Sequence, residues 1–212
     1  MTLAQLRAQV RRRLHDPDAT FFTDDDIDDA LNAGYMELSD ATEWFETWQT
    51  VDLVEDRPYY DLRTVLDRTV LSVGHAFNEQ TNRWMTPTSI RDLDTDRQWE
   101  NHTGEPERIT LRGLWWLGYW PRVQADSGTV RQHYTALPDA LEDDDDEPGF
   151  PDAFHDGLVE FAVAELWPHA GSVEWALLAW TAYLGHEARL RAHVQQRIGV
   201  PMTRGFGGDA RD

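Results

Sequence analysis

The chain has 212 residues and carries 39 Asp and Glu against 19 Arg, with no Lys and no Cys. This length corresponds to one domain with an elaboration or to about one and a half domains, and it can bury a hydrophobic core without covalent or metal cross-links. The absence of Cys excludes disulfides, thiolate zinc sites, iron–sulfur clusters and cysteine nucleophiles, and the net charge of −20 argues against a protein that grips nucleic acid through a basic surface.

The first 47 residues predict a pair of helices. Thr2 is a potential N-cap for the first helix, which has apolar residues at helical spacing: Leu3, Leu6, Val10 and Leu14. The second helix is expected to begin at Thr23, because Thr23 and Asp26 have the spacing of a capping box, and to run to about Trp44. Its acidic first turn suits the positive end of the helix dipole.

The period of the sequence then changes, and residues 48–140 predict a small antiparallel sheet inserted between helices. Five short runs are rich in β-branched and aromatic residues, and turn-forming stretches separate them. These runs are 49–54, 70–77, 108–111, 114–120 and 129–134. Between them, Ser89 is expected to cap a short helix within residues 87–99.

Helical spacing returns after residues 141–149, an acidic segment that we expect to be a solvated loop. Asp152 is expected to cap a helix that runs to about Trp167, and the last helix is expected over residues 172–198. The apolar side predicted for this last helix consists of Trp175, Leu178, Ala179, Ala182, Leu190 and Val194.

The chain ends in a tail, residues 199–212, whose four Gly and one Pro predict a flexible segment without a core of its own. Together these elements predict an α+β fold. In this predicted fold, the N- and C-terminal helices form a bundle, and a small β-rich subdomain is inserted in the chain between them. The expected divisions of the chain are 1–47, 48–140, 141–198 and 199–212.

No catalytic, metal or cofactor site is predicted. His186 and Glu187 resemble the start of a zinc-binding helix, but Leu190 occupies the position of the second His. Paired carboxylates are too frequent to indicate acid–base catalysis, and nucleophile-elbow, Walker and dinucleotide-binding glycine motifs are absent from the sequence. No apolar window approaches the roughly 20 residues of a membrane span, and no secretory signal is visible, so we expect a soluble protein made in the cytoplasm.

The amino-acid composition also indicates an environment. Arg replaces Lys throughout, and 25 Asp accompany 14 Glu. At molar salt the Debye length falls to about 3 Å, so crowded carboxylates repel one another little while they keep a surface hydrated. The composition therefore favours a halophilic source, and the alternative is an acidic protein from a GC-rich organism.

Several short phrases of the sequence occur in an order that resembles a known family. They are Leu3-x-x-Leu6-Arg-x-x-Val10, Phe22-Thr23-Asp24 followed by Ile27, Leu31-Asn32, Tyr35 and Glu37-Leu38, Tyr60-Asp-Leu62, Gly104-x-Pro106, Leu117 to Pro121, Tyr134-x-x-Leu137-Pro138 and Phe150-Pro-Asp-x-Phe154. Their order and spacing, over residues 1 to about 197, resemble the head-to-tail adaptor proteins (connector or head-completion proteins) of tailed double-stranded DNA viruses.

The resemblance implies a structural protein of the virion, located in the neck between the capsid portal and the tail. Its copies would form a homo-oligomeric ring of twelve that joins the portal protein to the next neck or tail protein. DNA would pass through the channel without specific binding, and neither a cofactor nor a membrane is implied. The charge of −20 suits such a channel, because a surface that neutralises few phosphates lets DNA slide.

Two groups of residues are candidates for contacts in such a ring. Trp115, Trp116 and Trp120, with the exposed sides of the long helices, are candidates for the interface between copies. The other interpretations are that these Trp side chains pack the sheet against the bundle, or stack on bases or sugars. The candidates for portal binding are Pro201, Met202, Arg204 and Phe206.

The composition of the tail is typical of a segment that orders on binding, and the alternative is a frayed end without function. Two other functions also stay open for the whole chain. One is another neck or head-completion component of the virion. The other is an acidic cytoplasmic enzyme with an unrecognised site.

Overall fold

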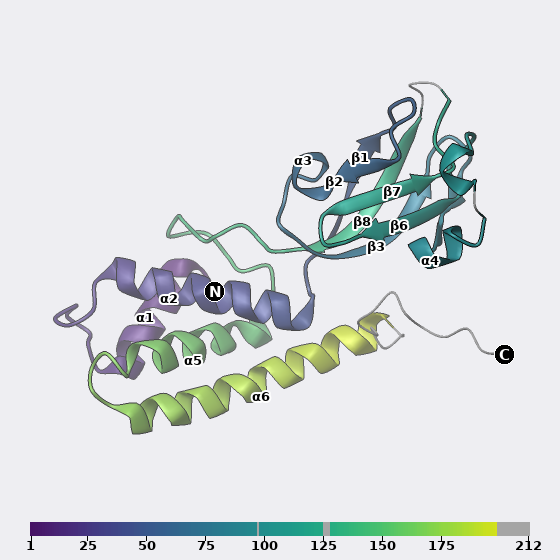
Figure 1. The fold of residues 1–212 in the computed structure, drawn as a ribbon. Helices are drawn as coiled ribbons and strands as arrows, with labels where there is room; N and C mark the ends of the chain where they lie inside the picture. The colour runs from purple at the N-terminus through teal and green to yellow at the C-terminus, as the bar shows by residue number, and fades with distance from the viewer. Residues whose placement is uncertain (97, 125–127, 199–212) are drawn as a thin grey trace. The chain divides into compact units, whose positions relative to one another are not determined.

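The computed structural model describes residues 1–96, 98–124 and 128–198, and it has the α+β fold class that the sequence predicts (Figure 1). The chain separates into two compact units. The helical unit contains Met1–Phe45 and the described residues from Leu137 on, and the β unit contains Glu46–Ala136. Helices from both ends of the chain thus share one unit, whereas the middle of the chain forms the other.

The described part of the helical unit contains four α-helices and one short 3-10 helix. They are α1 (Leu3–Leu14), α2 (Asp24–Thr42), η2 (Asp152–Phe154), α5 (His155–Leu166) and α6 (Val173–Ile198). Thr2 and Thr23 are the N-caps of the first two helices, as predicted: the Gln5 amide donates to Thr2 Oγ1 over 3.4 Å, and the Asp26 amide donates to Thr23 Oγ1 over 3.1 Å. Both caps are capping boxes, of which the sequence predicts the one at Thr23. α1 ends where His15 adopts a left-handed conformation, with a φ of 57°.

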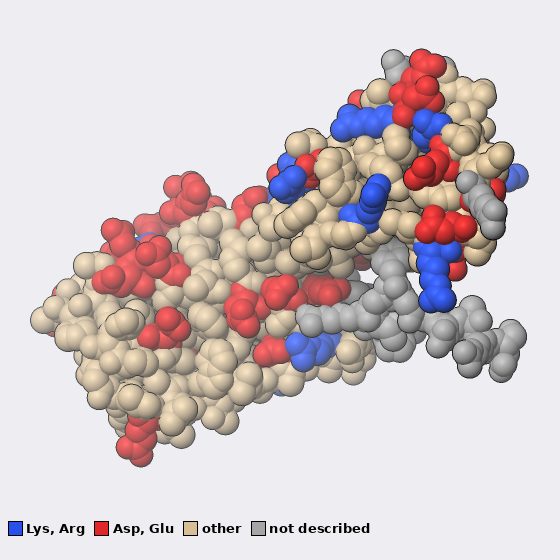
Figure 2. All heavy atoms as spheres, viewed as in Figure 1, with Lys and Arg blue, Asp and Glu red and all other residues tan. Residues whose placement is uncertain are grey.

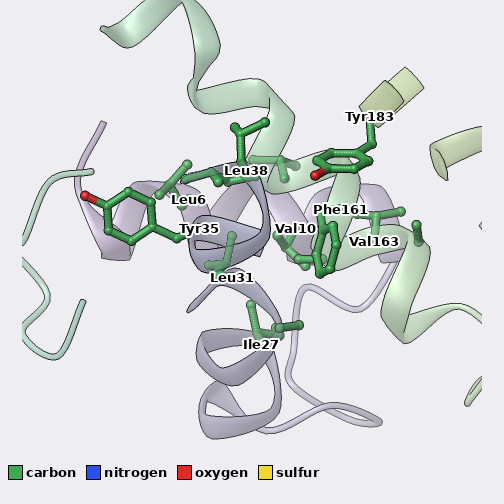
Figure 3. Packing of buried hydrophobic residues seen from close by; sticks show 14 of the residues in the cluster. Leu6, Val10, Ile27, Leu31, Tyr35, Leu38, Phe161, Val163 and Tyr183 are labelled. Atoms are coloured by element: carbon green, nitrogen blue, oxygen red, sulfur yellow. The ribbon is translucent and has the colours of Figure 1, made fainter. Parts of the chain in front are cut away.

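Helix α5 forms the centre of the helical unit. Its residues are buried from Gly157 to Ala164, because α1, α2 and α6 all pack against it. Figure 3 shows side chains from all four helices meeting in this core: Leu6, Val10, Ile27, Leu31, Leu38, Phe161, Val163 and Tyr183. α2 approaches α5 closely at Gly34, where an added Cβ would lie 2.8 Å from Phe161 Cδ1. The missing side chain at Gly34 therefore sets the spacing of these two helices.

The acidic segment 141–149 is held in place more firmly than a solvated loop would be. The carbonyls of Asp144 and Asp146 accept hydrogen bonds from the amides of Ala4 and Leu3, over 3.1 and 2.8 Å. These bonds satisfy amides at the N-terminus of α1, which have no partner within the helix. The prediction is thus right for the exposed carboxylates of this segment and wrong for its backbone.

Asp152 does not cap α5, contrary to the prediction. It lies in η2, and its carboxylate accepts a hydrogen bond from the Met1 amino group over 3.2 Å. The Met1 amino group also lies 2.8 Å from Nδ1 of the buried His155. Because the turn of η2 precedes α5, Phe154 takes the N-cap position, where no side-chain hydrogen bond is made.

The described residues of the β unit form eight strands, two short α-helices and a 3-10 helix. They are β1 (Glu46–Asp52), β2 (Tyr59–Asp61), α3 (Leu62–Val65), β3 (Val70–Asn78), β4 (Arg83–Trp84), β5 (Thr86–Pro87), α4 (Ile90–Leu93), η1 (Trp99–Asn101), β6 (Arg108–Arg112), β7 (Trp116–Trp120) and β8 (Thr129–Ala136). Ser89 caps α4 as predicted, by accepting a hydrogen bond from the Asp92 amide over 3.1 Å.

The strands form two sheets where the sequence predicts one. The first sheet has the order β1-β8-β3-β4 and is antiparallel, and the second has the order β2-β7-β6-β5, with β5 parallel to β6. The sequence prediction misses β2, β4 and β5. These strands have only two or three residues each, so they carry too little alternation to be recognised.

Buried side chains from the two sheets meet inside the β unit. Tyr119 of β7 donates its hydroxyl to Gln132 Oε1 of β8 over 3.3 Å, and its ring centre lies 5.4 Å from that of Tyr60. Gln132 is fully buried, and its amide donates to the carbonyl of His75 over 3.2 Å, where the register between β3 and β8 shifts. Gln132 thus satisfies a backbone group that the irregular pairing leaves without its ladder bond.

Candidate assembly surface

Helix α6 exposes a row of large apolar side chains. Val173, Leu177, Trp180 and Leu184 recur at spacings of four, three and four residues, which places them on one side of the helix. We call these four residues the α6 stripe. Between 40% and 62% of each residue is exposed. Such a row is typical of a helix side that packs on another protein surface.

The α6 stripe lies in a part of the helix with almost no charge. From Val173 to His186 the sole Asp, Glu or Arg is Glu174, although these residue types make up 27% of the chain. Partial burial, and then the nearby Arg189, lower the pKa of His186, so this imidazole is neutral at pH 7. The surface over the first half of α6 is mostly uncharged in Figure 2. On so acidic a protein, a charge-poor apolar surface is typical of a site that contacts another protein.

The prediction of which side of α6 is buried is wrong in part. Trp175, Leu178 and Ala182 are exposed, although the sequence prediction places them inward. The buried residues of α6 are Ala176, Ala179, Tyr183, Leu190 and Val194. Small Ala side chains let α6 approach α5 closely, and an added Cβ at Gly157 of α5 would lie 3.0 Å from the Cβ of His186. This close packing turns the larger side chains outward.

The three Trp residues that the sequence singles out lie in different environments. Trp115 and Trp116 are 41% and 43% exposed, beside the more exposed Leu114, at the turn between β6 and β7. Trp120 is half-buried, and its indole N–H donates to the carbonyl of Trp99 over 2.7 Å. The β6–β7 turn, meaning residues 114–116, is therefore accessible to another molecule, whereas Trp120 contributes to the fold of the β unit.

A second aromatic row lies on the outer face of the β1-β8-β3-β4 sheet. The Arg131 guanidinium lies 4.9 Å from the ring centre of Trp48 and 5.8 Å from that of Phe77. Trp84 contacts Phe77, with ring centres 5.1 Å apart, and His133, with ring centres 5.6 Å apart. These side chains pack on one another, so part of their apolar surface is already covered within the sheet. The α6 stripe is therefore the better candidate for a contact with another protein.

The remaining predicted site residues, Pro201, Met202, Arg204 and Phe206, lie outside the described residues. Within the described residues, no three His, Asp or Glu side chains are grouped so that they could hold a metal ion. None of the helices that the structure describes is long and apolar enough to span a membrane. The sequence prediction does not single out the α6 stripe. The signal that could have found it is the uncharged run from Trp175 to His186.

Comparison with protein families gives a match over nearly the whole chain. A family model described as SU10 adaptor protein matches residues 1–205. No curated protein matches this sequence. The matched region contains both the α6 stripe and the β6–β7 turn, so the two accessible apolar surfaces fall within the part that the family model covers.

Proposed function

The chain belongs to the SU10 adaptor protein family, and we propose that it is a head-to-tail adaptor whose copies form a closed ring in the neck of a tailed virus. Membership of the family makes it a structural protein of a phage virion, in contact with other virion proteins. The proposed ring has twelve copies. It joins the portal to the next neck or tail protein, and DNA passes through its centre.

The α6 stripe is the observation that best supports a ring. In a closed ring each copy uses two different surfaces, one for each neighbour. We assign the α6 stripe to one of these surfaces and the β6–β7 turn to the other. Burying the exposed parts of four large apolar side chains contributes roughly 3–6 kcal/mol. One contact of that size is weak, but ring closure gives every copy two of them.

The charge distribution supports a channel through which DNA passes. The β unit, residues 46–136, has 14 Asp and Glu against 10 Arg, and the rest of the sequence has 25 against 9. In the face shown in Figure 2, most charged side chains of the helical unit are carboxylates, whereas Arg and carboxylate side chains are intermixed on the β unit. A surface rich in carboxylates releases few counterions from DNA and so does not hold it.

Mutation of the α6 stripe tests the proposed ring. Leu177→Glu places a charge in the middle of the stripe and should abolish ring formation. The matched control is Ala182→Glu, which adds the same charge to an exposed residue of the same helix about 140° away around its axis. Native mass spectrometry and negative-stain electron microscopy give the mass and shape of the assembly. Rings that form equally well from both variants would contradict the assignment of the stripe.

We also propose that the tail binds the portal through Pro201, Met202, Arg204 and Phe206. This proposal has its support in the sequence, which combines apolar and basic anchors with Gly. Deletion of residues 199–212 should leave the number of copies in the ring unchanged. It should abolish co-sedimentation of the ring with the portal of the same virus. Truncated rings that bind the portal normally would show that the tail is not the anchor.

A halophilic host is the third part of the proposal, and it rests on the excess of carboxylates and the absence of Lys. Raising the salt concentration from 0.1 to 1 M shortens the Debye length from about 10 to about 3 Å. The repulsion between surface carboxylates then falls, so the midpoint of thermal unfolding should rise steadily with NaCl or KCl. A midpoint that is highest at low salt would favour an acidic protein from a GC-rich organism.

A further inference from the structure

A cavity of about 280 Å³ opens on the outer face of the β2-β7-β6-β5 sheet, within the β unit. Its lining includes Tyr59, Trp99, Thr110, Gly118, Trp120 and Arg122. Thr110 of β6 and Gly118 of β7 lie directly opposite one another in this sheet. An added Cβ at Gly118 would lie 2.8 Å from Thr110 Cγ2 and 3.0 Å from the Tyr59 ring. The missing side chain at Gly118 therefore lets Thr110 and the Tyr59 ring pack closely against β7 in the wall of the cavity.

The aromatic walls of this cavity are fixed by neighbouring side chains. The Trp120 indole is held by its hydrogen bond to the Trp99 carbonyl, and the Arg108 guanidinium lies 5.0 Å from its ring centre. Arg112 lies 5.3 Å from the ring centre of Tyr59. Preorganised walls lose little conformational freedom on binding. A cavity of roughly 150 Å³ holds benzene, so this one has room for a phenyl ring and a polar group beside it.

Two residues that line the cavity each carry a buried polar atom without a hydrogen-bond partner among the described residues: Oγ1 of Thr110 and Nε of Arg122. Both atoms are buried, and only 2% of Thr110 is exposed. Among the residues that the structure describes, the carboxylate that pairs with Arg122 is that of Asp56, whose Oδ1 lies 3.6 Å from Nη1 at the far end of the side chain. Because buried polar groups are normally paired, these atoms indicate a ligand that brings its own oxygen acceptor. The cavity thus suits an aromatic ring accompanied by a carboxylate.

The helical unit exposes a side chain of this chemistry. Phe21, in the loop between α1 and α2, is 62% exposed, and the exposed carboxylates of Asp18 and Asp25 flank it in the sequence. Asp16 holds the loop by accepting hydrogen bonds from the amides of Phe22, over 2.9 Å, and Phe21, over 3.1 Å. The bond from Phe22, together with other amide bonds, lowers the pKa of Asp16, so the carboxylate stays ionised at neutral pH. The loop therefore presents Phe21 in a defined position.

Phe21 lies at the end of the helical unit where the α6 stripe begins. Figure 1 shows the α1–α2 loop and the α5–α6 turn at this same end. The pKa of Asp26, at the start of α2, is lowered mainly by hydrogen bonds with Thr23 and in addition by His169 of the α5–α6 turn. The α1–α2 loop, which carries Phe21, and the α5–α6 turn, which precedes Val173, therefore lie at the same end of the helical unit.

The cavity extends the surface that contains the β6–β7 turn, because Trp116, Gly118 and Trp120 alternate onto one face of β7. We propose that Phe21 of one copy enters the cavity of the next copy, and that a carboxylate beside it accepts a hydrogen bond from Arg122 Nε. This contact rests on the proposed ring and adds a second, more specific connection to the one made by the α6 stripe. The occupant is thus a second copy of this chain.

Cross-linking between copies tests the contact directly, because the chain has no Cys of its own. Rings are assembled from a mixture of Phe21→Cys chains and Asn101→Cys chains, Asn101 being part of the cavity lining. A disulfide forms only where two Cβ atoms come within about 4.5 Å, so oxidation should give a covalent dimer on a non-reducing gel. In the control mixture Thr50→Cys, an exposed position on the other sheet, replaces Asn101→Cys and should give no dimer.

The outcomes separate this contact from the ring itself. A ring of the expected mass without the Phe21–Asn101 cross-link overturns the contact and leaves the proposed ring standing. Chains that stay monomeric at every salt concentration overturn both.

Variants of the two unpaired groups give a second, independent measurement. Thr110→Val removes the hydroxyl at nearly constant shape, so it should raise the thermal midpoint of the monomer and at the same time lower the fraction of chains in rings. Arg122→Gln should lower the ring fraction as well, whereas Arg83→Gln, at an exposed Arg of β4, should leave it unchanged. If Thr110→Val and Arg122→Gln both keep the ring fraction of the parent chain, the proposed contact is wrong.

Discussion

Arginine side chains have different surroundings in the two units of the molecule. In the helical unit they pair with carboxylates: Arg7 contacts Asp28 and Asp144, and Arg11 contacts Asp24. In the β unit, many Arg side chains lie over aromatic rings, in the pairs Arg57–Tyr60, Arg63–Trp115, Arg108–Trp120, Arg112–Tyr59 and Arg131–Trp48. Two of them, Arg63 and Arg131, also pair with the carboxylates of Asp61 and Glu79. The rings of Phe, Tyr and Trp do not change charge in acid, whereas a carboxylate loses its charge there. The helical unit is therefore the part of the molecule that depends more on pH.

Acid should produce a larger difference in stability between the two units than any single mutation does. Hydrogen bonds and ion pairs lower the pKa of five carboxyls in the helical unit, Asp16, Asp24, Asp26, Asp146 and Asp152, and of three in the β unit, Asp61, Glu79 and Asp92. A lowered pKa in the folded state means that the group stabilises the fold above its ordinary pKa and stops doing so as the pH falls through the lowered value.

The stability of the helical unit should accordingly decline below about pH 4, and its helices should unfold before the sheets. Amide signals in two-dimensional NMR spectra, assigned to each unit and followed from pH 7 to acid, measure the two transitions. Loss of both sets of signals in one step would show that the distinction between the units does not govern stability.

Replacing one buried Arg of the helical unit should have the next largest effect. Arg11 is 9% exposed, and its guanidinium donates to the Phe22 carbonyl over 3.0 Å and to Asp24 over 2.6 Å. Arg11→Ala leaves these acceptors without their donor and should cost about 2–4 kcal/mol of unfolding free energy. The neighbouring Arg12 is exposed, so Arg12→Ala should change stability by less than about 0.5 kcal/mol.

Urea denaturation of both variants, followed by circular dichroism at 222 nm, gives these differences. The cost of Arg11→Ala should also shrink in acid, because the partner Asp24 is then protonated. An equal loss of unfolding free energy in Arg11→Ala and Arg12→Ala would mean that the buried hydrogen bonds of Arg11 do not stabilise this end of the helical unit.

The features that the sequence predicted well are local ones. Thr2, Thr23 and Ser89 cap their helices as expected, because a capping box is formed within four consecutive residues. The sequence does not predict strand β2, because the three residues of this strand are defined by their pairing with β7, more than fifty residues later in the chain. Nothing within three residues encodes such a partner.

The assembly surface could be predicted only in part, for a different reason. Between Val173 and Leu184 apolar residues occur on all sides of α6, so periodicity alone does not choose the buried side. The size of the apolar side chains does not indicate the buried side either. The small Ala176 and Ala179 face the core, while Trp180 stays 40% exposed. The choice is made by the close approach of α5, which is a property of the packed unit. By contrast, the exposure of Trp115 and Trp116 fits their candidacy as contacts between copies, which remains a prediction.

The smallest expected effect comes from substitutions that change packing but not charge. They show whether charges alone determine the stability of the helical unit. An added Cβ at Gly34 would lie 2.8 Å from Phe161 Cδ1, in the middle of the core, whereas nothing lies within 4 Å of an added Cβ at Gly185 of α6. Overpacking costs typically 1–3 kcal/mol, and Ala favours a helix over Gly by about 1 kcal/mol. We therefore expect Gly34→Ala to lower the unfolding free energy by about 1 kcal/mol and Gly185→Ala to raise it by a similar amount.

Neither Gly substitution alters a charge, so these shifts, measured by urea denaturation, should be the same at pH 7 and pH 5 and at low and high salt. The effect of Arg11→Ala, in contrast, should weaken as acid or salt weakens its pairs. A Gly34→Ala shift that depends on salt would mean that the distance between α2 and α5 is set by the charges on their surfaces. A constant shift assigns that distance to the contact between Gly34 and Phe161, and leaves to the carboxylates the pH dependence that distinguishes the helical unit from the β unit.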